Sequence, residues 1–274
     1  MRTPLVLLFS CLLLTSACHQ VQEPVTGKTR HVVTSKEQEI ELGEQAYQQA
    51  LTQYQVVHDE AWTQLLDQVG QRIAHATDHP EYHWQFTIIK DAQLNAVALP
   101  SGQILVTSGM MCFAQNTAQL ATVLGHEAAH VTARHAGQKI TAQYGVRLGL
   151  GLINAVLVGR DMPGRQAIMQ LLGVGTQLGA MLPYSRQMES EADTIGMIYM
   201  AEAGYEPDAA LHLWEHMQAA TRGQSPPAFL SDHPSPGDRL ASLKGELAAA
   251  QQAYAKSPRY GTGVPMSEQC QIAH

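Results

Sequence analysis

Two histidines and a glutamate occur close together in LATVLGHEAAHVTARH, residues 120–135. His126, Glu127 and His130 have the HExxH spacing of a zinc-protease helix. On an α-helix, positions i and i+4 share a face, so both imidazoles could bind one ion while Glu127 lies beside the water-filled position. A chain with 13 histidines would contain this pattern by chance roughly one time in thirty, so its surroundings must support it.

A third protein ligand for zinc is available in MESEAD, residues 188–193. Glu189 and Glu191 are two positions apart and therefore point from different faces of a helix. Glu189 shares its face with Asp193, so one carboxylate could bind zinc while the other accepts the ring N–H of a ligand histidine. We assign Glu189 to the metal and Asp193 to the histidine, and we expect Glu191 to be a solvated or capping charge.

The elements that must position these residues are mostly helices. The HExxH pattern falls on a helix that we expect to begin at Asn116 and to stop at Gly137. The spacing of apolar residues predicts further helices over 36–54, 60–76, 187–203, 208–220 and 239–253.

Three short β-rich runs precede the HExxH helix, at 84–90, 95–99 and 102–109. The sequence Pro-Ser-Gly at 100–102 marks a hairpin turn between the last two. We therefore expect an antiparallel sheet with the 95–99 strand near an edge. The predicted fold class is α+β, a mostly helical zincin-type domain with a small antiparallel sheet and an HExxH active-site helix.

Residues 145–182 are apolar and rich in glycine, with a break at 161–164. Neither half reaches the roughly 20 apolar residues of a membrane-spanning helix. We expect two helices packed through glycine faces. The alternative is that the pair touches a membrane surface or gates a cleft.

The N-terminus has the pattern of a secretory signal, with Arg2 before an apolar run, 5–14, that is too short to span a bilayer. The ending TSAC resembles a bacterial lipobox, after which Cys18 would carry lipid. A plain cleaved signal peptide is the alternative. His19 follows in place of aspartate, which in such lipoproteins favours the outer membrane. We expect a lipid-anchored protein of the bacterial periplasm.

The chain is long enough for one large domain. We expect four parts: a lipoprotein-type signal peptide at 1–17, a polar tether at 18–35, a zinc metallopeptidase domain at 36–256 and a C-terminal tail at 257–274, whose final residues should be loose.

The net charge of −7 argues against nucleic acid as a partner. Two cysteines, Cys112 and Cys270, remain after signal removal and acylation. In an oxidising periplasm they could pair and tie the tail to the residues ahead of the HExxH helix. The alternative is one buried thiol and one in a loose tail.

Four motifs in this order resemble the HtpX and CAAX-prenyl-protease family of gluzincin metallopeptidases, family forty-eight, in its periplasmic lipoprotein branch of BepA-like and LoiP-like proteins. They are LNAVALPSGQILVTSGM, LGHEAAHVTARH, YSRQMESEADTIGM and DHPSPGDRL. The resemblance covers most of the chain after the signal. The chain stops soon after the last predicted helix, so the resemblance implies the LoiP-like form without helical repeats.

The resemblance implies one zinc ion on His126, His130 and Glu189, with Glu127 as catalytic base. It also singles out two further residues for the site. The residue matching His233 can approach the metal, and the one matching Arg239 can brace the glutamate ligand. His233 therefore has three interpretations: a transition-state donor, a removable fourth zinc ligand that keeps the enzyme latent, or a loop histidine. We expect His135, Tyr184 and Arg186 to be mainly structural.

The expected activity is a zinc-dependent endopeptidase of the cell envelope that cleaves misfolded or misassembled periplasmic and outer-membrane proteins. Zinc would lower the pKa of its water, and Glu127 would pass the proton to the leaving amine. The substrate backbone would add to an exposed strand at Asn95, Ala96 and Val97. The alternative is a zinc-stabilised outer-membrane assembly or binding factor with little turnover.

Overall fold

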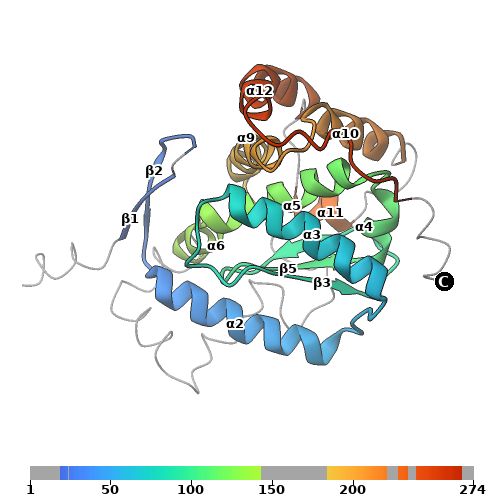
Figure 1. Cartoon of the computed structure of the whole chain (residues 1–274). Helices are drawn as coiled ribbons and strands as arrows, with labels where there is room; N and C mark the ends of the chain where they lie inside the picture. The colour runs from blue at the N-terminus through green and yellow to red at the C-terminus, as the bar shows by residue number, and fades with distance from the viewer. Residues whose placement is uncertain (1–18, 24, 143–183, 221–227, 234–238, 267–274) are drawn as a thin grey trace, which may run out of the picture.

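The computed structural model describes residues 19–23, 25–142, 184–220, 228–233 and 239–266. The predicted signal peptide, Cys18, the glycine-rich pair and Cys270 lie outside these residues. Within the described ranges no helix is long and apolar enough to cross a membrane. The architecture is α+β, as predicted, with small sheets among many helices (Figure 1).

In the described part of the chain, two helices precede the main sheet. Helix α2, Lys36–Gln53, begins with a capping box, in which Ser35 and Gln38 each bind the other's backbone N–H through their side chains. Helix α3, Glu60–Ala76, is capped by Asp59 and buries the apolar face that its sequence predicts. Both helices agree with the predicted ranges to within a residue.

The main sheet has strands β3, Gln85–Ile89, β4, Ala96–Ala98, and β5, Gln103–Thr107, in the order β3-β5-β4. A turn that ends at Gly102, with φ of 102°, joins β4 and β5 as the predicted antiparallel hairpin, and β4 lies at the edge. However, β3 and β5 are parallel, so the all-antiparallel prediction is wrong. Apolar alternation predicts a strand but carries no information on its direction.

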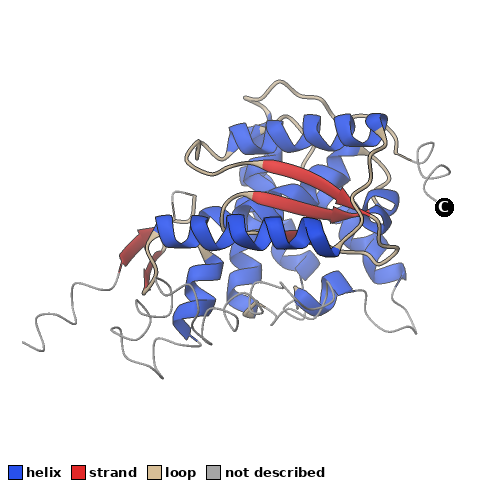
Figure 2. Ribbon diagram, turned by 90° about the horizontal axis from the view of Figure 1, so that it is seen from below, coloured by secondary structure: helices blue, strands red, loops and turns tan. Residues whose placement is uncertain are grey.

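Helices cover both faces of this sheet (Figures 1 and 2). Alternate residues of the central strand pack in opposite directions, as the two-residue period of a strand requires. Leu105 belongs to the smaller apolar cluster, which includes α2, whereas Ile104 and Val106 belong to the larger cluster, which includes α3 and the HExxH helix. The sheet therefore lies between α2 on one face and α3 and the HExxH helix on the other.

The remaining helices build the site and its surroundings. They are α4, Ser108–Phe113, α5, Thr117–Thr132, α6, His135–Ile140, α9, Arg186–Glu202, α10, Asp208–Ala220, α11, Ala228–Asp232, and α12, Arg239–Tyr254. Asn116 caps α5 as predicted, by accepting the backbone N–H of Gln119. Helix α5 is buried along its whole length, which makes it the centre of the domain.

The predicted stop of the HExxH helix at Gly137 is wrong. Helix α5 ends at Thr132, and Arg134 then adopts a left-handed backbone conformation with φ of 54°. The buried Arg134 guanidinium is held by the Glu39 carboxylate at 2.6 Å and by the Thr34 carbonyl oxygen at 2.7 Å. These contacts stabilise a bend that the local sequence does not predict. Gly137 lies inside α6, after this bend.

Both ends of the described chain fold against the domain. The predicted tether contains an antiparallel hairpin of β1, His19–Gln22, and β2, Thr29–Val32. The C-terminal tail, described as far as Met266, returns to the start of α5. Val264 O accepts the N–H of Thr117 at 3.0 Å, so this part of the tail is not loose.

Candidate metal centre

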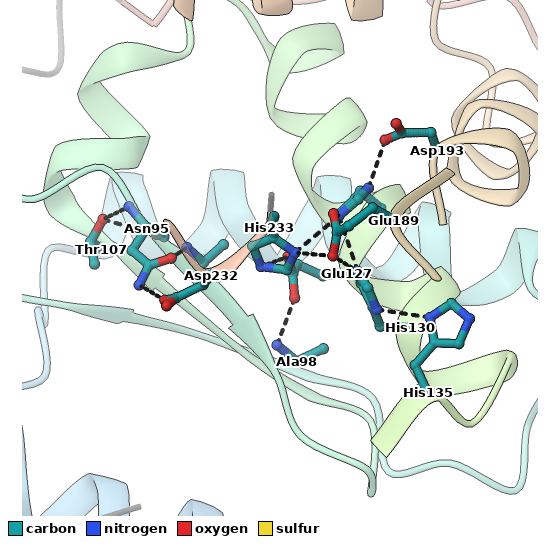
Figure 3. Close-up of polar contacts among 12 residues, drawn as sticks. Asn95, Ala98, Thr107, Glu127, His130, His135, Glu189, Asp193, Asp232 and His233 are labelled. Atoms are coloured by element: carbon teal, nitrogen blue, oxygen red, sulfur yellow. Dashed lines mark hydrogen bonds and ion pairs between the residues drawn. The ribbon is translucent and has the colours of Figure 1, made fainter. Parts of the chain in front are cut away.

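His126 and His130 lie one turn apart on α5, opposite Glu189 in the first turn of α9. Figure 3 shows His130 and Glu189 close together. His126 Nε2 is 3.1 Å from His130 Nε2 and 3.3 Å from Glu189 Oε2. His130 Nε2 is 3.5 Å from Glu189 Oε1. All three side chains are buried. The fold therefore brings together the three residues that the sequence analysis assigns to zinc.

His233, which follows the short helix α11, completes this group. Its Nδ1 is 3.2 Å from His126 Nε2 and 3.2 Å from Glu189 Oε1, while its Nε2 faces Glu127 Oε1 at 3.4 Å. The side chain is buried, and one donor atom from each of His126, His130, Glu189 and His233 lies within 4.8 Å of the others. The arrangement offers four donors around one point.

The donor set fits one zinc ion. A tetrahedral ion about 2.0–2.2 Å from each nitrogen or oxygen sets its donors about 3.3–3.6 Å apart. The distances given above, which join every pair except His130 and His233, are 3.1–3.5 Å. Glu189 Oε2 is buried and accepts no hydrogen bond from the described residues. Such a buried, unmatched carboxylate oxygen beside three imidazoles is costly unless a cation binds it.

The charges of the site favour a cation. Burial alone would raise the pKa of Glu189, but His233, His126 and His130 outweigh it and hold that pKa well below its usual range. Burial lowers the pKa of His130, which keeps its ring neutral. For His126, burial would lower the pKa, but the nearby Asp193 and Glu189 carboxylates outweigh it and raise the pKa to about 9. The carboxylates that attract this proton would equally attract a metal ion in its place.

Asp193 and Arg239 support His126 from behind. Asp193 Oδ1 is 3.0 Å from His126 Nδ1, the ring nitrogen that points away from the other donors. Arg239 donates to the same Asp193 oxygen, stacks 3.5 Å above the Trp214 ring, and reaches Glu189 Oε2 only as a 3.8 Å ion pair. Arg239 therefore braces mainly the aspartate, and through it the orientation of His126.

Two further buried residues, Glu191 and His135, belong to the surroundings of the donor group. Glu191, expected to be a solvated or capping charge, is 2% exposed and binds Arg30 at 2.9 Å, so that expectation is wrong. The helix pattern of α9 could not show that the N-terminal hairpin covers this position. His135 is fully buried, with its Nδ1 2.8 Å from His130 Nδ1. The only sequence signal for it was a third histidine five positions after His130.

The strand assigned to substrate runs beside Glu127. It lies at the edge of the sheet, but Asn95, Ala96 and Val97 are buried, so the expectation of an exposed strand is wrong. The N–H of Ala96 donates to the Asn95 side chain at 2.9 Å, and the N–H of Ala98 donates to Glu127 Oε2 at 2.8 Å. The Asn95 amide also donates to Asp232 at 3.1 Å.

Fold and site together define a zinc metallopeptidase of the HExxH class. Residues 60–247 match Peptidase family M48, and the chain belongs to this family. It is therefore a metalloendopeptidase, and its buried histidine and glutamate group is suited to one zinc ion.

Relatives of known function come from mitochondria and from bacteria. The mitochondrial metalloendopeptidase OMA1 of Schizosaccharomyces pombe is 31% identical over 261 residues, which cover 93% of this chain and 75% of that protein. OMA1 of Saccharomyces cerevisiae is 29% identical, with 93% and 77% covered. The beta-barrel assembly-enhancing protease of Escherichia coli (strain K12) is 28% identical over 81% of this chain. The alignment covers 46% of the E. coli protein, so this chain spans less than half of its length.

Proposed function

We propose that this metalloendopeptidase acts in the bacterial cell envelope, anchored to the outer membrane by lipid at Cys18, and cleaves misfolded or misassembled periplasmic and outer-membrane proteins. The single observation that carries the catalytic part is the group of four buried donors beside Glu127. The signal and lipobox pattern before His19 supports the location. The similarity to a bacterial beta-barrel assembly-enhancing protease supports the substrate class.

His126, His130 and Glu189 would hold the zinc, which when bound supplies a Lewis acid that polarises a peptide carbonyl and acidifies water. Glu127 is the proton carrier in this proposal. It follows His126 directly on α5, and burial raises the pKa of its carboxylate, which makes it a stronger proton acceptor. The carboxylate takes a proton from the attacking water and gives it to the amine of the broken peptide bond.

A peptide backbone would lie along β4, the edge strand next to Glu127. The N–H groups of Ala96 and Ala98 are the donors that such a peptide needs, and the Asn95 and Glu127 side chains now occupy them. Substrate entry thus requires these two side chains to give up their contacts. Backbone pairing of this kind recognises an extended chain with little demand on its sequence, which suits unfolded proteins.

His233 would keep the resting enzyme latent. Its Nδ1 takes the fourth place in the donor group, at 3.2 Å from both His126 Nε2 and Glu189 Oε1. A fourth protein ligand is typical of closed structural zinc sites, whereas catalytic sites leave that position to water or substrate. Movement of the segment that carries His233 would then open the site.

Casein cleavage by the purified, zinc-loaded protein tests this function. We expect Glu127→Gln to abolish cleavage and retain zinc, and His233→Ala to raise the basal cleavage rate several-fold. Full metal content in His126→Ala would overturn the ligand assignment. If Glu127→Gln abolished cleavage but fully supported cells under envelope stress, the alternative of an assembly or binding factor would replace the proposal.

A further inference from the structure

Two buried residues outside the donor group form a path from His130 to the N-terminal hairpin. His135 Nδ1 lies 2.8 Å from His130 Nδ1, within hydrogen-bond distance. On the other side of the ring, His135 Nε2 lies 3.7 Å from Glu191 Oε2, an electrostatic contact rather than a hydrogen bond. Both residues are at most 2% exposed. Figure 3 shows His135 on the side of His130 away from His233.

The protons along this path follow from the role proposed for His130. A nitrogen that binds zinc needs its lone pair, so Nε2 of His130 must be bare and Nδ1 must carry the proton. Only a bare Nδ1 on His135 can accept that N–H. The proton of neutral His135 then sits on Nε2, the nitrogen that faces the Glu191 carboxylate. Each N–H along the path therefore points away from the zinc ligand, and the last one points toward the negatively charged Glu191.

The N-terminal hairpin holds that negative charge in place. Arg30 of β2 donates to Glu191 Oε2 at 2.9 Å, and the Thr26 hydroxyl, in the turn between β1 and β2, donates to Glu191 Oε1 at 3.1 Å. Lys28 Nζ adds a 3.9 Å ion pair from the same turn. Three side chains of a segment far from α9 in the sequence therefore converge on one carboxylate.

The two histidines on α5 thus have comparable support. Behind His126 stands Asp193, bound by Arg239. Behind His130 stands His135, next to Glu191, which is bound by Arg30. Support of this type fixes the ring and its tautomer, and its loss commonly weakens metal binding 10–100-fold.

We propose that His135 and Glu191 are positioning residues for His130, and that the β1–β2 hairpin, through Thr26 and Arg30, is part of the zinc site's support. The inference rests on the proposed ligand role of His130. It gives the segment that directly follows Cys18 a task in the peptidase beyond that of a spacer. Zinc retention, rather than folding alone, should therefore depend on the hairpin.

Zinc affinity, measured by competition with a chromophoric chelator on the mature protein, tests the proposal. We expect His135→Phe to weaken zinc binding at least tenfold. His135→Asn should lose less, because the asparagine oxygen can still accept the N–H of His130. Arg30→Gln should weaken binding several-fold, although Arg30 lies outside the donor group. Lys36→Gln, which removes a surface ion pair with Glu81, is the matched control and should bind zinc normally.

A second readout separates positioning from mere packing. In the cobalt-substituted protein, the visible absorption bands report ligand geometry, and His135→Phe should shift them while His135→Asn largely restores them. Wild-type zinc affinity in both His135→Phe and Arg30→Gln would overturn the proposal, as would a lowered unfolding temperature of the zinc-free protein with unchanged affinity. His130→Ala tests the ligand role of His130 separately from the supporting role of His135 and Glu191. If His130→Ala still bound zinc normally, the ligand assignment itself would be wrong.

Discussion

Gly125 of α5 and Gly196 of α9 face each other where the two helices that carry the zinc ligands cross. A Cβ atom at Gly125 would lie 2.6 Å from Gly196 O, and one at Gly196 would lie 2.6 Å from the backbone nitrogen of His126. Backbone against backbone leaves no room for even a methyl group. This close approach allows His126 to reach Glu189 across the helix pair.

Gly196→Ala should therefore separate α5 from α9 and harm both stability and metal binding. We expect a loss of about 1–3 kcal/mol in the free energy of unfolding, measured in urea, with a lower zinc affinity. Gly245→Ala is the control, because a Cβ there meets no atom within 4 Å. On helix α12 it should stabilise by about 0.5–1 kcal/mol. Equal effects of the two substitutions would refute the packing argument.

Asp193→Asn should weaken zinc binding about tenfold while the fold is retained. The amide keeps the shape of the side chain but removes the charge that holds His126 and pairs with Arg239. Chelator competition measures the affinity. Asp208→Asn, which alters a contact with Gln251 away from the site, should leave the affinity unchanged. An unaltered affinity in Asp193→Asn would show that the aspartate does not support the ligand.

Glu39→Ala should destabilise the protein by about 3–5 kcal/mol, because it leaves the buried Arg134 guanidinium without its carboxylate. The bend after α5 depends on this pair, so the start of α6 should lose protection in amide hydrogen exchange. Glu37→Ala, on the exposed side of the same helix, should stay within about 0.5 kcal/mol of wild type. If Glu39→Ala also stayed within about 0.5 kcal/mol of wild type, the stabilising role of the Glu39–Arg134 pair would be contradicted.

Lys139 should make the stability of the protein depend on pH. Burial lowers its pKa to about 8, against weaker opposing effects of Asp232 and Glu189. Between pH 8 and 10.5 the unfolded chain keeps a proton that the folded chain has released, so this group adds stability as the pH rises. Lys139→Met should stabilise by at most about 3 kcal/mol at pH 7, and the gain should shrink toward pH 10. A gain that does not change with pH in urea unfolding would contradict the shifted pKa.

Contacts that are close in sequence could be predicted, and distant ones could not. The face of α3 and the cap at Asn116 follow from residues within a few positions of one another. The pairing of Glu189 and Asp193 on one face of α9 follows from the helical period in the same way. These features need only local geometry, so His126, His130 and Glu189 could be assigned to zinc before the fold, whereas His233 entered only through the family resemblance.

The wrong expectations all depend on residues that meet only after folding. Glu191 is buried because Arg30, 161 positions away, lies on it. Helix α5 stops early because Glu39, 95 positions away, holds Arg134. The parallel direction of β3 is likewise a property of the assembled sheet. No periodicity in a single segment contains such information.

The pairing of Cys112 with Cys270 stays a prediction, but the chain path gives it a basis. The N–H of Met266 donates to Gln115 O at 2.9 Å, which brings the tail close to the predicted partner. The four residues from Met266 to Cys270 span at most about 14 Å. We expect reduction to change the mobility of the oxidised wild-type protein in gel electrophoresis. The Cys112→Ser variant should not show this change. No shift in the oxidised wild-type protein would exclude the bond.

The return of the tail to α5 also decides where this protein can be shortened. Thr117 and Ala118 donate their backbone N–H groups to Val264 O and Thr262 O, at 3.0 and 3.2 Å. The first turn of a helix has no partners of its own for these groups. A chain cut after residue 256 would keep every zinc donor, yet it would uncover the end of the helix on which two of them stand. We therefore expect the working boundary of the peptidase to lie beyond α12, at or after Met266.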